Sequence, residues 1–170
     1  MRKLLGVFGL VALLMSVAVL GTDMPGAQPN PTVHATLSSF EETPLTLSTP
    51  GTGSFRAKIS PSMIEYELSY ANTEGTVFVA HIHLGRPAIT GGVIAFLCGG
   101  GGKPACPPEG TVTGTIVDSD IIGPTGQGIT PGEFNEAVRA ILAGATYANV
   151  HTNLFPGGEI RGPISGLGAN

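Results

Sequence analysis

Apolar and polar residues alternate in short runs along most of the chain, and turn residues separate the runs. Val, Ile, Tyr, Phe and Thr dominate the runs, while Pro, Gly and Asn fill the breaks, as is typical of strands and the turns between them. About eight strands are expected, at residues 36–40, 53–59, 63–70, 77–84, 93–98, 111–117, 145–152 and 159–165. The pattern predicts an all-β fold, a Greek-key-like β-sandwich or small barrel.

One segment has the period of a helix instead. Thr130 suits the N-cap, Pro131 the first helical position and Glu133 the place three residues after the cap. A single short helix is therefore predicted over about 131–143, with Gly144 placed to end it. Its apolar stripe, which we expect to cover one open end of the sandwich, consists of Phe134, Val138, Ile141 and Leu142.

The first residues, Met1-Arg2-Lys3, precede an uncharged run of apolar and small residues from Leu4 to Leu20. A short positive segment before such a run is typical of a secretory signal peptide, so a secreted or extracytoplasmic protein is expected. The run is close to the shortest that spans a bilayer. An uncleaved N-terminal membrane anchor is therefore the alternative, and the only contact with a membrane that we expect.

Two places suit cleavage of this signal, because Pro25-Gly26-Ala27 and Val33-His34-Ala35 both end in a small residue. The second is favoured, since it has Val three residues and Ala one residue before the cut. Residues 1–35 are then signal peptide and spacer, and 36–170 form the domain. His34 would leave with the signal.

The composition argues against nucleic acid as a partner. Only 8 residues are Lys or Arg and the net charge is −4, so no basic surface is expected for nucleic acid.

Cys98 and Cys106 flank a Gly-rich loop, and an even pair in an exported chain predicts a disulfide. Two metal thiolates are the alternative, but the spacing is not that of a zinc site.

Four stretches of sequence are more specific than these general patterns. They are Ala80-His81-Ile82-His83-Leu84-Gly85, Gly91 to Cys98, Thr113-Gly114-Thr115-Ile116, and Tyr147-Ala148-Asn149-Val150-His151-Thr152 with the following Pro156-Gly157-Gly158-Glu159-Ile160-Arg161-Gly162. In wording and order they resemble the CHRD (chordin-type) domain, of the kind found singly in secreted bacterial proteins, from about residue 36 to 164. The resemblance implies a secreted binding or structural module with an extracellular or cell-surface partner that the sequence leaves unidentified.

The histidines of these stretches suggest a metal site. Residues two apart in a strand share a face, so His81 and His83 point the same way with Cα atoms about 7 Å apart. If the strand of His151 lies alongside, three imidazoles gather on one face, a set that suits copper or zinc. Three residues could orient these imidazoles: Asn149, Glu159 and Arg161. Glu159 and Arg161 could instead form an ion pair with each other.

Two other interpretations of the histidines stay open. They can be neutral structural groups that hydrogen-bond to backbone carbonyls, Asn149, Thr152 or Glu159. His-x-His is also similar to part of the copper site of Cu/Zn superoxide dismutases, but that pattern needs more histidines and an Asp. A metal-dependent oxidoreductase would need a general base, and the chain has neither a candidate for it nor a nucleophile motif such as Gly-x-Ser-x-Gly. No enzymatic activity is predicted.

Overall fold

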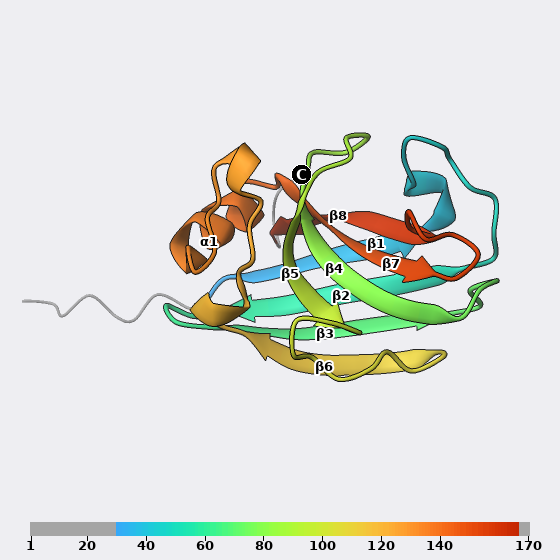
Figure 1. Ribbon diagram of the computed structural model, residues 1–170, viewed down its shortest axis with the longest axis horizontal. Helices are drawn as coiled ribbons and strands as arrows, with labels where there is room; N and C mark the ends of the chain where they lie inside the picture. Colours follow the sequence, from blue (N-terminus) through green and yellow to red (C-terminus); the bar gives the residue numbers. More distant parts are fainter. Residues whose placement is uncertain (1–29, 167–170) are drawn as a thin grey trace, which may run out of the picture.

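The computed structural model describes residues 30–166 (Figure 1). Its regular elements are β1 (Thr32–Ser38), β2 (Thr52–Ile59), β3 (Ile64–Ala71), β4 (Val77–Leu84), β5 (Val93–Cys98), β6 (Gly110–Ile116), α1 (Phe134–Leu142), β7 (Thr146–Thr152) and β8 (Ile160–Gly166). Three single 3₁₀ turns lie at Ser39–Glu41, Asp118–Asp120 and Thr125–Gln127. The predicted mostly β fold with one helix is confirmed.

The eight strands form one antiparallel sheet in the order β5-β4-β7-β8-β1-β2-β3-β6. The sheet curls until its two edge strands, β5 and β6, approach each other (Figure 1). Of the two architectures expected from the sequence, the chain thus adopts the barrel-like one. Its interior is filled by side chains that alternate along the strands and are at most 1% exposed, among them Leu37, Phe55, Leu68, Ile82 and Ile160.

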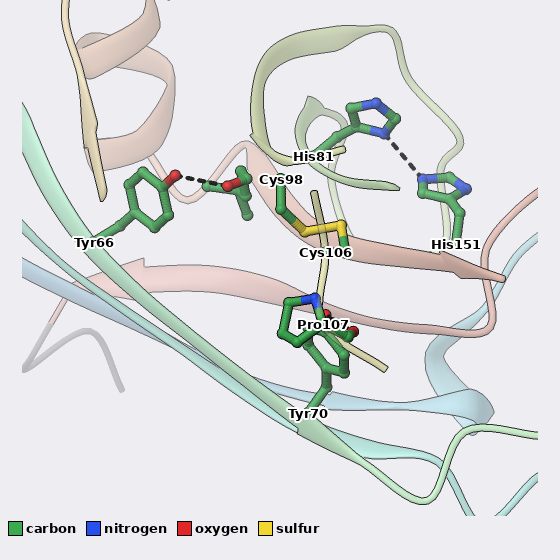
Figure 2. The surroundings of a disulfide bond; sticks show 8 residues. Tyr66, Tyr70, His81, Cys98, Cys106, Pro107 and His151 are labelled. Atoms are coloured by element: carbon green, nitrogen blue, oxygen red, sulfur yellow. Dashed lines mark hydrogen bonds between the residues drawn. A yellow bond between two sulfur atoms is a disulfide. The ribbon is translucent and has the colours of Figure 1, made fainter. Parts of the chain in front are cut away.

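The seam between the edge strands is held by groups that reach across it. Cys98 at the end of β5 forms the predicted disulfide with Cys106 in the loop that leads to β6. From β3, the Tyr66 hydroxyl donates to the Leu97 carbonyl at 2.7 Å, and the Tyr70 hydroxyl donates to the Pro107 carbonyl at 2.6 Å. Figure 2 shows Tyr66, Tyr70 and Pro107 around the disulfide.

The structure places the start of the domain earlier than residue 36. Strand β1 begins at Thr32, where Val33 and Ala35 are buried in the core. It pairs with β2 along its length and with β8 on the other side. The folded domain therefore includes residues that the sequence assigned to the spacer, His34 among them. The apolar run assigned to the signal peptide lies outside the described residues, and no helix within 30–166 has the length and apolar character to cross a membrane.

The helix begins three residues later than the sequence suggested. Gly132 has φ of +87°, which breaks the helical path after Pro131, so residues 130–133 form a turn. The Glu133 carboxylate still accepts the Thr130 N–H, at 2.6 Å. The end is as predicted: Gly144 has φ of +63° and its N–H donates to the Ile141 carbonyl. The buried face differs from the expected stripe and consists of Phe134, Ala137 and Ile141.

One part of the sheet is buried on both faces. All seven residues of β7 are buried, and so are five of the six from Val79 to Leu84 on β4. Ala80, Ile82, Ala148 and Val150 fill the interior. Their strand neighbours therefore face outward, under the loops that precede β5 and β8. Polar side chains are enclosed at this place.

Candidate metal-binding site

His81, His83 and His151 meet on this covered outer face. Strands β4 and β7 pair so that His81 lies opposite Asn149 and His151 opposite Val79. One nitrogen from each of the three rings lies within 4.8 Å of the others. The histidines are 9%, 7% and 7% exposed in chain order. The structure thus brings together the three side chains that the sequence proposed as ligands, just below the surface.

Hydrogen bonds to carbonyl oxygens fix the orientation and the protonated nitrogen of two rings. Nδ1 of His83 lies 3.0 Å from the Gly91 carbonyl oxygen, and Nδ1 of His151 lies 3.0 Å from that of Pro156. A carbonyl oxygen only accepts, so each Nδ1 must carry the hydrogen. Nε2 of both rings therefore presents a lone pair.

The remaining nitrogens are unequally satisfied. His151 Nε2 lies 3.1 Å from Nδ1 of His81 (Figure 2), and since His151 Nε2 is an acceptor, His81 donates there. His83 Nε2 is buried and has no hydrogen-bond partner. A buried acceptor without a partner costs about 1–3 kcal/mol. The cluster therefore includes a buried lone pair, on Nε2 of His83, that no hydrogen bond uses.

All three imidazoles are held in the neutral form that a metal requires. Burial lowers the pKa of His81 to about 3, and the neighbouring His151 and His83 add to the shift. Burial also lowers the pKa of His83 to about 4, against the opposing effect of its bond to Gly91. The pKa of His151 is likewise lowered by burial. At neutral pH no proton needs to leave before a cation binds.

Aromatic rings and one guanidinium enclose the cluster. Phe96 meets His81 edge-on with ring centres 4.6 Å apart, and Tyr147 stacks on His83 at 4.8 Å with planes 5° apart. The guanidinium carbon of Arg161 lies 4.4 Å from the centre of the Tyr147 ring. Arg161 is fixed there by donating to the Glu41 carbonyl at 2.6 Å. The predicted residue Arg161 thus reaches the histidines through Tyr147, not by direct contact.

The other two residues proposed to orient the imidazoles make no hydrogen bond to them. Asn149 lies opposite His81 in the strand register, but its buried Oδ1 has no partner. Glu159 is fully buried elsewhere, where it accepts from the Glu74 N–H at 2.7 Å and the Thr152 hydroxyl at 2.8 Å. Among residues 30–166 there is no ion pair between Glu159 and Arg161. Glu159 instead ties the turn before β4 to the end of β7.

A buried carboxyl that the sequence did not reveal lies beside Gly158 and Asn149. Glu42 is 4% exposed, and its Oε1 has no hydrogen-bond partner. A Cβ atom on Gly158 would lie 2.7 Å from both Glu42 Oε1 and Asn149 Oδ1, so both orphaned oxygens face the same glycine. Burial raises the pKa of Glu42 to about 7, although Arg161 opposes the shift. Nothing local marks Glu42, because it follows a second Glu in a polar turn.

The arrangement of motifs along the chain can now be compared with known families. The model of the CHRD domain matches residues 33–164. This chain belongs to the CHRD domain family. The match includes all three histidines and begins within β1, and it confirms the resemblance seen in the sequence. CHRD domains are in general binding or structural modules without catalytic activity. No curated protein and no solved structure matches the chain.

Proposed function

We propose that this CHRD domain is an extracytoplasmic metal-binding module that holds one copper or zinc ion between His81, His83 and His151. The observation that carries the proposal is the buried, unpartnered Nε2 of His83 on a ring that contributes one nitrogen to the cluster of three within 4.8 Å of one another. A bound cation would satisfy that lone pair. Imidazole nitrogen is a preferred ligand of both metals.

Two of the rings make the hydrogen bonds that are usual for metal-ligating histidines. Metal-ligating histidines usually donate their second ring N–H to a carbonyl or carboxylate, as His83 and His151 do to Gly91 and Pro156. The 3.1 Å between His81 Nδ1 and His151 Nε2 is close to the about 3.3 Å that separates two nitrogens around a tetrahedral zinc with bonds of about 2.0–2.1 Å. To serve as a ligand through Nδ1, His81 moves its hydrogen to Nε2.

The location outside the cytoplasm rests on two separate features. The N-terminal run after Met1-Arg2-Lys3 has the form of a secretory signal, and the Cys98–Cys106 disulfide is of the kind that persists in oxidising compartments. We propose no catalytic step.

Titration of the purified protein with Zn(II) and Cu(II), followed by calorimetry and thermal unfolding, tests the proposal. About one equivalent is expected to bind, and metal at about 100 times Kd should stabilise the fold by about 2.7 kcal/mol. The variants His83→Gln and His151→Gln should lose binding. Because the imidazoles are already neutral, binding at pH 7 should release almost no protons into the buffer.

His34→Gln is the matched control, because His34 lies on β1, outside the cluster. It should bind metal like the wild type. If the wild type binds none of Zn(II), Cu(II) and Cu(I) at micromolar concentration, or if His34→Gln loses binding as the cluster variants do, the proposal fails.

A further inference from the structure

No negatively charged group bonds to the rings of the histidine cluster within the described residues. The three ligands are neutral, and the groups that bond to their rings are the carbonyls of Gly91 and Pro156. Within residues 30–166 no carboxylate hydrogen-bonds to any of the three rings. The cluster therefore offers a cation no negative charge among its ligands or their hydrogen-bond partners.

Arg161, the charged residue that contacts the aromatic rings around the cluster, is positive. Arg161 lies over Tyr147, which stacks on His83, so one aromatic ring separates its charge from the cluster. Glu159, which could have compensated Arg161, is turned away toward Glu74 and Thr152. Glu42 is the other acid nearby, but within residues 30–166 it forms no ion pair with Arg161. A cation in the cluster thus meets the field of Arg161 with no paired carboxylate to offset it.

Both effects penalise a divalent ion more than a monovalent one. The cost of moving an ion out of water rises with the square of its charge, so it is about four times larger for a 2+ than for a 1+ ion of the same size. Repulsion from a fixed cation rises in proportion to the charge. Among the metals that imidazoles bind well, copper has a stable monovalent form.

We infer that the ion this site holds most tightly is Cu(I), bound by three neutral imidazoles with Arg161 as the residue that discriminates against divalent ions. The inference rests on the proposed metal-binding function and deepens it. It makes Cu(I), supplied by a donor of monovalent copper, the cargo of the domain. Zn(II) and Cu(II) become weaker competitors for the same nitrogens.

The test compares dissociation constants on the purified protein. Cu(I) is measured anaerobically with ascorbate by competition with bicinchoninate, Cu(II) by competition with glycine, and Zn(II) by calorimetry. The expected result is a Kd for Cu(I) at least tenfold below those for Cu(II) and Zn(II). The bound copper should then have a reduction potential above that of copper in the same buffer.

Arg161→Met keeps an apolar stem for Tyr147 and removes the charge. It should shrink the ratio of the Cu(II) to the Cu(I) dissociation constant about tenfold, which corresponds to about 59 mV for a one-electron couple. Arg161→Lys keeps the charge and should keep most of the ratio of the Cu(II) to the Cu(I) dissociation constant. It therefore shows whether the charge or the shape of the Arg161 side chain sets that ratio. Arg56→Met is the control, since Arg56 is an exposed arginine on β2, away from β4 and β7; it should leave the ratio unchanged.

The outcomes separate this inference from the function on which it rests. If no ion binds, the proposed metal site is itself wrong. If Zn(II) or Cu(II) binds more tightly than Cu(I), the metal site stands and the preference for Cu(I) is overturned. If Arg161→Lys changes the ratio as much as Arg161→Met does, the role given to the charge of Arg161 is overturned.

Discussion

Glu42 illustrates how a single buried carboxyl links stability to pH. It lies beside Asn149 and Gly158 with an unpartnered oxygen, and burial raises its pKa from 4.5 to about 7. The folded state therefore holds this proton more tightly than the unfolded chain does. The stabilisation is complete below pH 4.5 and is lost as the pH rises through 7.

Replacing Glu42 with Gln should remove this pH dependence. One pKa unit corresponds to 1.36 kcal/mol, so the wild type should lose roughly 3 kcal/mol from this group between pH 4.5 and 7. The free energy of unfolding of wild type and Glu42→Gln, measured with urea at pH 5 and pH 8, gives the difference directly. The histidines act in the opposite direction below pH 6.5, but they are common to both proteins and cancel. Equal pH profiles would contradict the role given to Glu42.

The sequence predicted the residues whose positions follow from strand periodicity. It did not predict those that a loop or the pairing of strands brings to the site. Alternation placed His81 and His83 on one face, and the motif around Asn149 pointed to His151. The contribution of Tyr147, which stacks on His83, depends on the pairing of β4 with β7. Glu42 reaches the site only because a loop folds over the outer face, and its neighbours along the chain give no sign of burial.

Among the elements, β6 shows how a glycine lets a neighbouring strand close the barrel. Gly114 lies opposite Tyr66 in the β3–β6 register. A Cβ atom at Gly114 would lie within 2.4 Å of the Tyr66 hydroxyl oxygen. Because that space is free, the Tyr66 ring passes over β6 and its hydroxyl reaches the Leu97 carbonyl on β5.

Variants of this pair should therefore be coupled. Tyr66→Phe should cost about 1–2 kcal/mol, since it leaves the Leu97 carbonyl without its donor, and Gly114→Ala should cost a similar amount by displacing the ring. The double variant should cost less than the sum, because the displaced hydrogen bond is lost only once. Urea unfolding of the four proteins measures the coupling. Strict additivity would show that Gly114 and Tyr66 act separately.

The limits of the helix and of β1 show why element boundaries were harder to predict. Thr130, Pro131 and Glu133 have the residue types of a helix start, but the left-handed Gly132 between them delays the helix to Phe134. The residues before 36 resembled a cleavage site because they are small. Val33 and Ala35 are small and apolar since they are buried in a strand that lies between β8 and β2.

For the molecule as a whole, β1 is needed for the continuity of the sheet, which bears on the site of signal cleavage. A chain cut after Ala35 would lack four of the seven residues of β1, including the buried Val33. If the proposed signal is cleaved, we therefore expect the mature protein to begin before Thr32, and Pro25-Gly26-Ala27 supplies the nearest suitable cut. Intact-mass measurement of protein recovered after export checks this. A folded product that starts at Thr36 would contradict it.

The order of the strands in the sheet could not be predicted from the sequence. Eight short amphipathic runs are compatible with a sandwich or a barrel, and neither periodicity nor turn type says which distant runs pair. Pairing of β8 with β1 and of β7 with β4 joins segments far apart in the chain. The Cys98–Cys106 bond was predictable because its partners are only eight residues apart in sequence.

The contact between β1 and β8 also constrains the time course of folding. The first and last strands that the structure describes are neighbours at the middle of the sheet, so the contact order is high and folding is slow compared with that of helical domains. While the C-terminal end of the chain is held during synthesis, β8 cannot pair and the facing edges of β7 and β1 stay open; while the N-terminal end is held, the facing edges of β8 and β2 stay open. Such open edges invite aggregation, so the nascent domain depends on prompt release of both its ends.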